Sequence, residues 1–177
     1  MIKENRKTKI ILYFLLAVYF LVIINLTVFR GGNSRESSVN LIPFLTLFSQ
    51  LKSFLLDFNL FSLFNLIGNL ALFFPLAYTG ALEIPKMRTF KVSFLVFFLL
   101  TVFIEFFQYL LRCGASDVDD LILNVLGALL MLKLYHYQAK KMERRKLYHW
   151  AVMIVILSLI PYTFYAFQGL FGLRIHV

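Results

Sequence analysis

Long apolar blocks dominate the chain, and they have the length that a membrane-spanning helix needs. A helix crosses a hydrocarbon core of roughly 30 Å with about 20 residues. We predict five spans, at residues 10–29, 60–80, 92–111, 119–135 and 148–167. The fourth is the shortest, and it can cross because Asp119 would lie at the interface while Lys133 extends its ammonium group toward water. The pattern predicts an all-α polytopic membrane protein, with residues 1–177 in a single domain.

The segment between the first two spans has a different pattern. Residues 31–38, GGNSRESS, are polar and rich in turn-forming residues, so they predict a loop. From Phe44 to Phe58, apolar residues recur at helical spacing with polar residues between them. A helix of about 22 Å is too short to cross a bilayer comfortably. We therefore predict an outer amphipathic helix, which lies on the outer leaflet or packs as a lid over the outer ends of the spans.

The distribution of basic residues predicts the orientation of the chain. There are 18 Lys and Arg residues against 9 Asp and Glu, which gives a net charge of +9. With the N-terminus inside, thirteen of the basic residues are cytoplasmic and five are outside, as the positive-inside rule requires. We predict an N-in, C-out topology, with the basic residues of 140–146 on anionic lipid rather than nucleic acid. The single cysteine, Cys113, excludes an intramolecular disulfide, and the 3 dispersed histidines argue against a zinc centre.

Polar side chains interrupt three of the apolar segments at a similar depth in the outer half of the bilayer. Counted from the outer boundary at 1.5 Å per residue, they lie roughly 6 to 13 Å deep. They also share helix faces, because they repeat at spacings of three, four or seven residues. We predict that they line an outward-facing polar pocket. The predicted ligand-binding residues are Asn65, Asn69, Glu105, Gln108, Arg112, Asp117, Asp120 and Asn124.

Several of these polar positions also have a purely structural interpretation. Ser116 followed by Asp119 matches an N-cap pattern at the start of the fourth span. Asn65 can serve as a hydrogen-bonding partner between helices. Glu105 is harder to explain in this way, because an ionisable group within a span costs several kcal/mol unless it is paired. Its candidate structural partners are Arg112 and Asn124.

Three motifs in this order resemble the VanZ-like family of membrane proteins. They are N-L-I-G-N-x4-F-P at Asn65–Pro75, E-x-x-Q at Glu105–Gln108, and D-V-D-D-x3-N-x-x-G at Asp117–Gly127. The stretch from Asn40 to Phe44, NLIPF, is also similar to the family's outer-loop signature. The resemblance covers about residues 40–132 and implies five spans. It implies a bacterial plasma-membrane protein that can lower susceptibility to teicoplanin and other lipidated glycopeptides.

The resemblance points to the same polar residues and adds a few others. The positions that match the family are Asn65, Asn69, Pro75, Glu105, Gln108, Asp117, Asp119, Asp120, Asn124 and Gly127. The chain departs from the family at Ala77 and Met131, where family members often have glycine. Arg112 is slightly early for the arginine that often precedes the aspartates, so its assignment rests on the stripe that it shares with Glu105.

Three classes of function are compatible with this pattern. A binding protein would hold the head group of a membrane lipid or a lipid-linked cell-wall intermediate, with Arg112 on a phosphate. An enzyme acting on an envelope lipid would use Glu105 or Asp120 for catalysis, or hold Mg²⁺ or Ca²⁺ with Asp117, Asp120 and Glu105. A transporter fits less well, because the inner half of the spans has no matching polar path. A homo-oligomer remains open, and we favour the binding protein.

Overall fold

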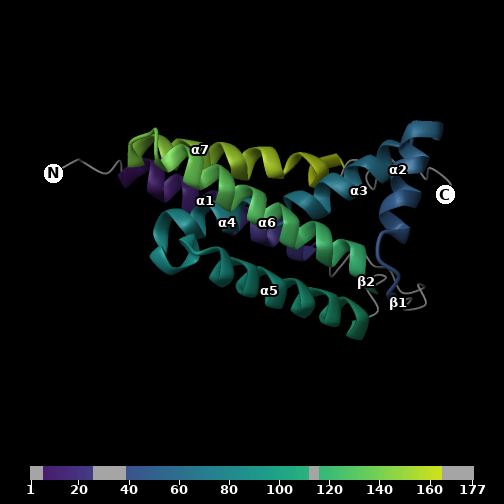
Figure 1. The fold of residues 1–177 in the computed structure, drawn as a ribbon. Helices are drawn as coiled ribbons and strands as arrows, with labels where there is room; N and C mark the ends of the chain where they lie inside the picture. The colour runs from purple at the N-terminus through teal and green to yellow at the C-terminus, as the bar shows by residue number, and fades with distance from the viewer. Residues whose placement is uncertain (1–5, 26–38, 112–115, 165–177) are drawn as a thin grey trace.

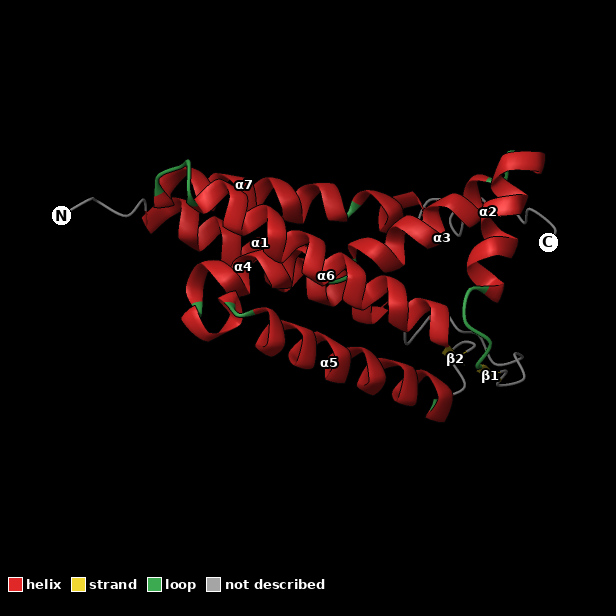
Figure 2. Ribbon diagram, viewed as in Figure 1, coloured by secondary structure: helices red, strands yellow, loops and turns green. Residues whose placement is uncertain are grey.

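The computed structural model describes residues 6–25, 39–111 and 116–164 of the chain. Within these ranges the chain is almost entirely helical, which confirms the all-α class (Figure 2). The helices are α1 (Arg6–Ile24), α2 (Leu45–Asp57), α3 (Leu60–Ala71), α4 (Phe74–Glu83), the 3-10 turn η2 (Pro85–Arg88), α5 (Phe90–Leu110), α6 (Val118–Ala139) and α7 (Arg144–Ser158). Two short strands, β1 (Val39–Asn40) and β2 (Ser116–Asp117), pair in parallel.

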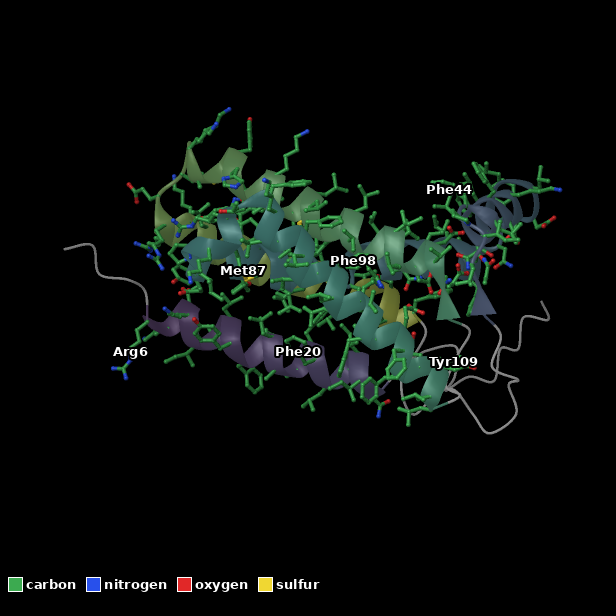
Figure 3. All side chains as sticks on the ribbon, turned by 60° about the horizontal axis from the view of Figure 1, so that its bottom comes forward. Arg6, Phe20, Phe44, Met87, Phe98 and Tyr109 are labelled. Atoms are coloured by element: carbon green, nitrogen blue, oxygen red, sulfur yellow. The ribbon has the colours of Figure 1, made fainter. Side chains whose placement is uncertain are left out.

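The long helices run side by side, and α2 lies across one end of them (Figure 1). We call this end, which also carries β1 and β2, the α2 end of the bundle. α6 is the central helix, because it packs against α3, α4, α5 and α7. Nitrogen and oxygen atoms gather near the two ends of the bundle, with Arg6 at one and Phe44 at the other, whereas carbon dominates between them (Figure 3).

Four helices of the described ranges are long and apolar enough to cross a membrane. They are Arg6–Ile24, Leu60–Glu83, Phe90–Leu110 and Arg144–Phe164. No more than 44% of any of these four is buried within the protein, so most of their apolar surface needs a bilayer to cover it. The predicted span 119–135 corresponds to α6, which is not among the four. α6 has 22 residues, enough for about 33 Å, and lies enclosed by its neighbours.

The second span is broken in its middle. α3 ends at Ala71, and α4 begins at Phe74 with Pro75 in its first turn. Because proline has no N–H, the carbonyl of Ala71 lacks its usual helical donor. The hydroxyl of Tyr19 on α1 donates instead, to the carbonyl oxygens of Ala71 at 3.2 Å and Leu72 at 2.9 Å. An unsatisfied carbonyl in hydrocarbon costs several kcal/mol, so Tyr19 makes the break tolerable within a span.

A second tyrosine, from the C-terminal part of the chain, donates to a carbonyl just before the same break. Tyr162, just beyond α7, donates its hydroxyl to the carbonyl oxygen of Gly68 at 2.8 Å. Its ring meets the ring of Tyr19 edge-on, with centroids 6.0 Å apart. The break therefore links the first, second and last spans through buried phenols, and it fixes where α1 sits against the bundle.

The outer helix forms where the apolar periodicity predicts it, as α2. The side chains turned toward the bundle include Thr46, Gln50 and Ser53, which are half-buried. The opposite face is apolar and exposed, for example at Phe48 and Leu55, which are 64% and 61% exposed. An apolar face turned away from the bundle is what a helix resting in a leaflet needs, so this geometry favours the leaflet arrangement over a simple lid.

Candidate functional site

The candidate site begins at the first residue before α6. Asp117 is the N-cap of this helix, and its carboxylate accepts a hydrogen bond from the backbone N–H of Asp119 at 2.9 Å. The prediction that Ser116 caps the helix together with Asp119 is therefore wrong. Ser116 is held in extended conformation by its pairing with Val39, so the helix starts after Asp117. This frees the carboxylate of Asp119 for a different contact.

Asp119 caps α2 rather than its own helix. Its carboxylate accepts hydrogen bonds from the backbone N–H of Phe44 at 2.5 Å and of Leu47 at 2.9 Å. The N-cap residue of α2 is Phe44, which has no capping group and adopts a left-handed φ of 67°. A carboxylate at a helix N-terminus satisfies free N–H groups and complements the helix dipole. Asp119, only 1% exposed, thus anchors the outer helix to the bundle.

Asn40 ties the same region together from β1. The parallel register places it opposite Asp117. Its amide nitrogen donates to Asp117 Oδ1 at 3.2 Å and to Thr46 Oγ1 at 2.9 Å, and its amide oxygen accepts from the N–H of Ile42 at 3.1 Å. Sequence reasoning did not assign Asn40 to the site. The signal was present, because Asn40 is the first residue of the NLIPF stretch.

Glu105 reaches this cluster from α5. It is buried, at 8% exposed, and its Oε2 accepts the backbone N–H of Asp117 at 3.2 Å. Asp120 lies within electrostatic range of Glu105, Asp117 and Asp119. The structure therefore brings four acidic side chains from α5 and the start of α6 to one place at the α2 end. We call these residues, with Asn69 and Asn124, the polar cluster.

Two amides complete the polar cluster from deeper in the bundle. The amide nitrogen of Asn69, on α3, donates to Asp120 Oδ1. The amide nitrogen of Asn124, on α6, donates to Thr101 Oγ1 at 2.8 Å. Thr101 is another residue that sequence reasoning missed, although it lies one helical turn from Glu105 in a largely apolar span. Asn124 is 2% exposed, and its amide oxygen has no hydrogen-bond partner among the residues that the structure describes.

A close helix contact positions these amides. A Cβ atom added at Gly127 would lie 1.8 Å from the carbonyl oxygen of Leu70, so α6 touches the backbone of α3 at this point. Only glycine permits that distance, in line with the role of small residues between membrane helices. The contact explains why Asn69, next to Leu70, reaches Asp120 on the facing helix.

The remaining predicted residues are Asn65, Gln108 and Arg112. Asn65 is half-buried on α3, one turn from Asn69. Gln108 faces an apolar cavity between α1 and α5, and Arg112 lies outside the described residues. Within the part of the chain that the structure describes, no group of three or more His, Cys, Asp or Glu side chains is arranged to hold a metal ion. A Mg²⁺ or Ca²⁺ site at Asp117, Asp120 and Glu105 stays a prediction.

Comparison with known proteins places the chain in a family. A family model described as VanZ/LLP1 matches residues 10–139, from α1 to the end of α6. The chain belongs to the VanZ/LLP1 family. Protein VanZ of Enterococcus faecium is 28% identical to it over an alignment of 153 residues, and the alignment covers 82% of this chain and 86% of that protein. No solved structure matches the chain.

The VanZ/LLP1 match contains the whole polar cluster. Its residues come from α3, α5, β2 and α6, and Asn40 of β1 also lies inside the matched range. α7 lies beyond the match, although Tyr162, which follows it, helps to satisfy the broken span. The resemblance that the three sequence motifs carry is thus confirmed, and the motifs meet in space at the α2 end.

Proposed function

We propose that this VanZ/LLP1 protein lies in the bacterial plasma membrane and holds the polar head of a lipid or a lipid-linked cell-wall intermediate in the polar cluster. With the predicted N-in topology, the α2 end faces the outer leaflet, where teicoplanin meets its membrane-bound target. Occupation of the site alters the access of lipidated glycopeptides to that target, and it thereby lowers susceptibility to teicoplanin.

The observation that carries this proposal is the unpartnered amide oxygen of Asn124. A buried acceptor without a donor costs about 1–3 kcal/mol. Asn124 lies on α6 one turn from Asp120, and the predicted topology puts it at a depth where hydrocarbon would surround the bundle. Polar groups kept at such a cost within spans mark functional positions. A ligand that donates a hydrogen bond to Asn124 would remove that cost on binding.

The chemistry of the polar cluster narrows the class of head group. Its described side chains are mainly acceptors, since carboxylates accept and Asn124 offers a free amide oxygen. A head rich in hydroxyl or amino groups, as in a sugar or a peptide, complements such a site. We assign a phosphate of the same ligand to Arg112. A phosphate needs a positively charged donor, which a guanidinium supplies and the acceptors of the polar cluster do not.

The test compares two buried amides on the same helix. Asn124→Ala removes the amide of the polar cluster, and Gln138→Ala removes a buried amide that accepts from Tyr78 near the other end of α6. Cells expressing each variant are assayed for the teicoplanin concentration that stops growth, with the amount of protein in the membrane fraction measured in parallel. We expect Asn124→Ala to lower the teicoplanin concentration that stops growth about five-fold, which corresponds to one hydrogen bond of about 1 kcal/mol.

Gln138→Ala should keep the protection of the parent protein at equal membrane levels. The proposal fails if Asn124→Ala is present at the parent level and teicoplanin susceptibility does not change. Glu105→Gln gives a second measurement, because glutamine still accepts the N–H of Asp117 but removes one negative charge. Unchanged susceptibility in both variants would exclude a role of the polar cluster in resistance.

A further inference from the structure

An apolar cavity of about 380 Å³ lies between α1 and α5. This volume falls within the range of small-molecule sites. Its floor is the broken span, at Leu72, Phe73 and Leu76. α1 and α5 run along its two sides, as the purple and teal helices of Figure 3 show. We call it the α1–α5 groove.

The lining of the α1–α5 groove matches hydrocarbon. None of its described lining residues carries a charge. The hydroxyl of Tyr19 is already engaged by the carbonyls of the break, so that residue presents its ring. Gln108 is the one amide in the lining. The groove is also continuous with the lipid-facing surface, because Phe20 and Phe103 at its edges are 39% and 59% exposed.

The length and depth of the groove match one leaflet. Along α5 its lining runs from Leu100 to Leu111, which is about 16 Å at 1.5 Å per residue. That is about half of a 30 Å hydrocarbon core. Leu100 is near the middle of α5, and the groove ends at the α2 end, beyond Gln108. The groove therefore extends from mid-membrane to the level of the polar cluster.

We propose that the α1–α5 groove binds one acyl chain of a bilayer lipid from the leaflet at the α2 end, with the chain terminus toward Leu100 and its polar end at Gln108. The inference deepens the proposed function and rests on it, since the polar end of the lipid at Gln108 would lie one turn of α5 from Glu105 of the polar cluster.

The test uses two adjacent leucines of α5. Leu100 lines the groove and is 38% exposed, whereas Leu99 lies outside the lining and is 56% exposed. The full chain is reconstituted in nanodiscs of phosphatidylglycerol that include a phosphatidylglycerol with a photoactivatable diazirine in mid-chain. After illumination, labelled peptides are quantified by mass spectrometry for the parent protein, Leu100→Trp and Leu99→Trp.

We expect labelling of the parent to concentrate on groove residues such as Leu72, Leu76 and Ile104, and to saturate with the labelled lipid. Leu100→Trp fills the groove and should lower that labelling about ten-fold, whereas Leu99→Trp should leave it unchanged. Equal labelling in both variants, or labelling spread evenly over the outward residues of α5, would overturn the proposal. A bifunctional cross-linker is added to a parallel sample, and protein–protein cross-links at groove residues that Leu100→Trp abolishes would also overturn the proposal, since a second copy would then be the occupant.

Glu105→Gln separates this inference from the proposed function. If groove labelling persists in Glu105→Gln while teicoplanin susceptibility is unchanged, the acyl-chain site stands and the head-group function fails. If Glu105→Gln and Asn124→Ala lose protection but Leu100→Trp keeps parent labelling, the head-group site stands and the groove is excluded.

Discussion

The carboxylate of Asp119, on α6, accepts the backbone N–H of Phe44, 75 positions earlier in the chain, and so caps the helix that follows Phe44. The same carboxylate accepts the N–H of Leu47 at 2.9 Å. The outer helix α2 thus has no cap of its own and depends on the first turn of α6. This contact joins α2 to the helix that carries Asp119, Asp120 and Asn124 of the polar cluster.

Removing the Asp119 carboxylate should release α2. We expect Asp119→Ala to weaken the first turn of α2 by about 1–2 kcal/mol, the usual value of a helix cap, and to speed local amide exchange by about five- to thirty-fold. Hydrogen exchange with mass spectrometry on the protein in detergent measures this at Leu45–Asp57. Asp119→Asn keeps an acceptor oxygen and should show a smaller change. Exchange in α2 equal to that of the parent would show that other contacts hold the helix.

Tyr19 should be needed for the broken span. Tyr19→Phe keeps the ring but leaves the carbonyls of Ala71 and Leu72 without their donor. We expect a loss of about 1–3 kcal/mol in stability, seen as a lower thermal midpoint in detergent. Tyr13→Phe is the matched control, because Tyr13 is on the same helix and 45% exposed. Equal midpoints for the two variants would contradict the role given to the Tyr19 hydroxyl.

Gly127 should be intolerant of any side chain. In Gly127→Ala the new Cβ would lie 1.8 Å from the backbone oxygen of Leu70, so α3 and α6 must separate. We expect lower thermal stability and weaker teicoplanin protection, since Asn69 and Asp120 would move apart. Gly80→Ala is the control, because its Cβ would meet only the flexible side chain of Met87, at 2.8 Å. A Gly127→Ala protein as stable and protective as Gly80→Ala would disprove the close contact.

The charged contacts at the end opposite α2 should contribute modestly to the stability of the fold, and less as the salt concentration rises. Glu83 lies 3.3 Å from Lys9 and 3.6 Å from Arg144, and it accepts the hydroxyl of Tyr148. Arg144 is about half exposed, so solvent screens part of this attraction. We expect Glu83→Gln to lower the free energy of unfolding by about 1 kcal/mol at low salt and by less at high salt.

Thermal midpoints in detergent at two salt concentrations check this expectation. Glu143→Gln is the matched control, because Glu143 is an exposed glutamate at the start of α7 and its loss removes the same charge. A midpoint difference between parent and Glu83→Gln that does not shrink with salt would mean that the hydroxyl of Tyr148, rather than the two cations, carries the contact.

The apolar pattern by itself predicted the membrane class, the position of the helices and the amphipathic character of α2. These features are local, because the length of an apolar block and its periodicity decide whether a helix can cross or rest in a bilayer. The stripe of Asp120 and Asn124 on α6 was equally readable, since residues four apart share a helix face.

Only the tertiary structure decided which partners these side chains meet. Nothing in the spacing around Asp119 indicates that it caps α2, and nothing around Tyr19 indicates the carbonyls of a distant helix. Gln108 shares a stripe with Glu105, yet a rotation of about 60° between positions three apart turns it toward the α1–α5 groove. Such contacts depend on how helices pack across the bundle, and packing is set by side chains that lie far apart in the sequence.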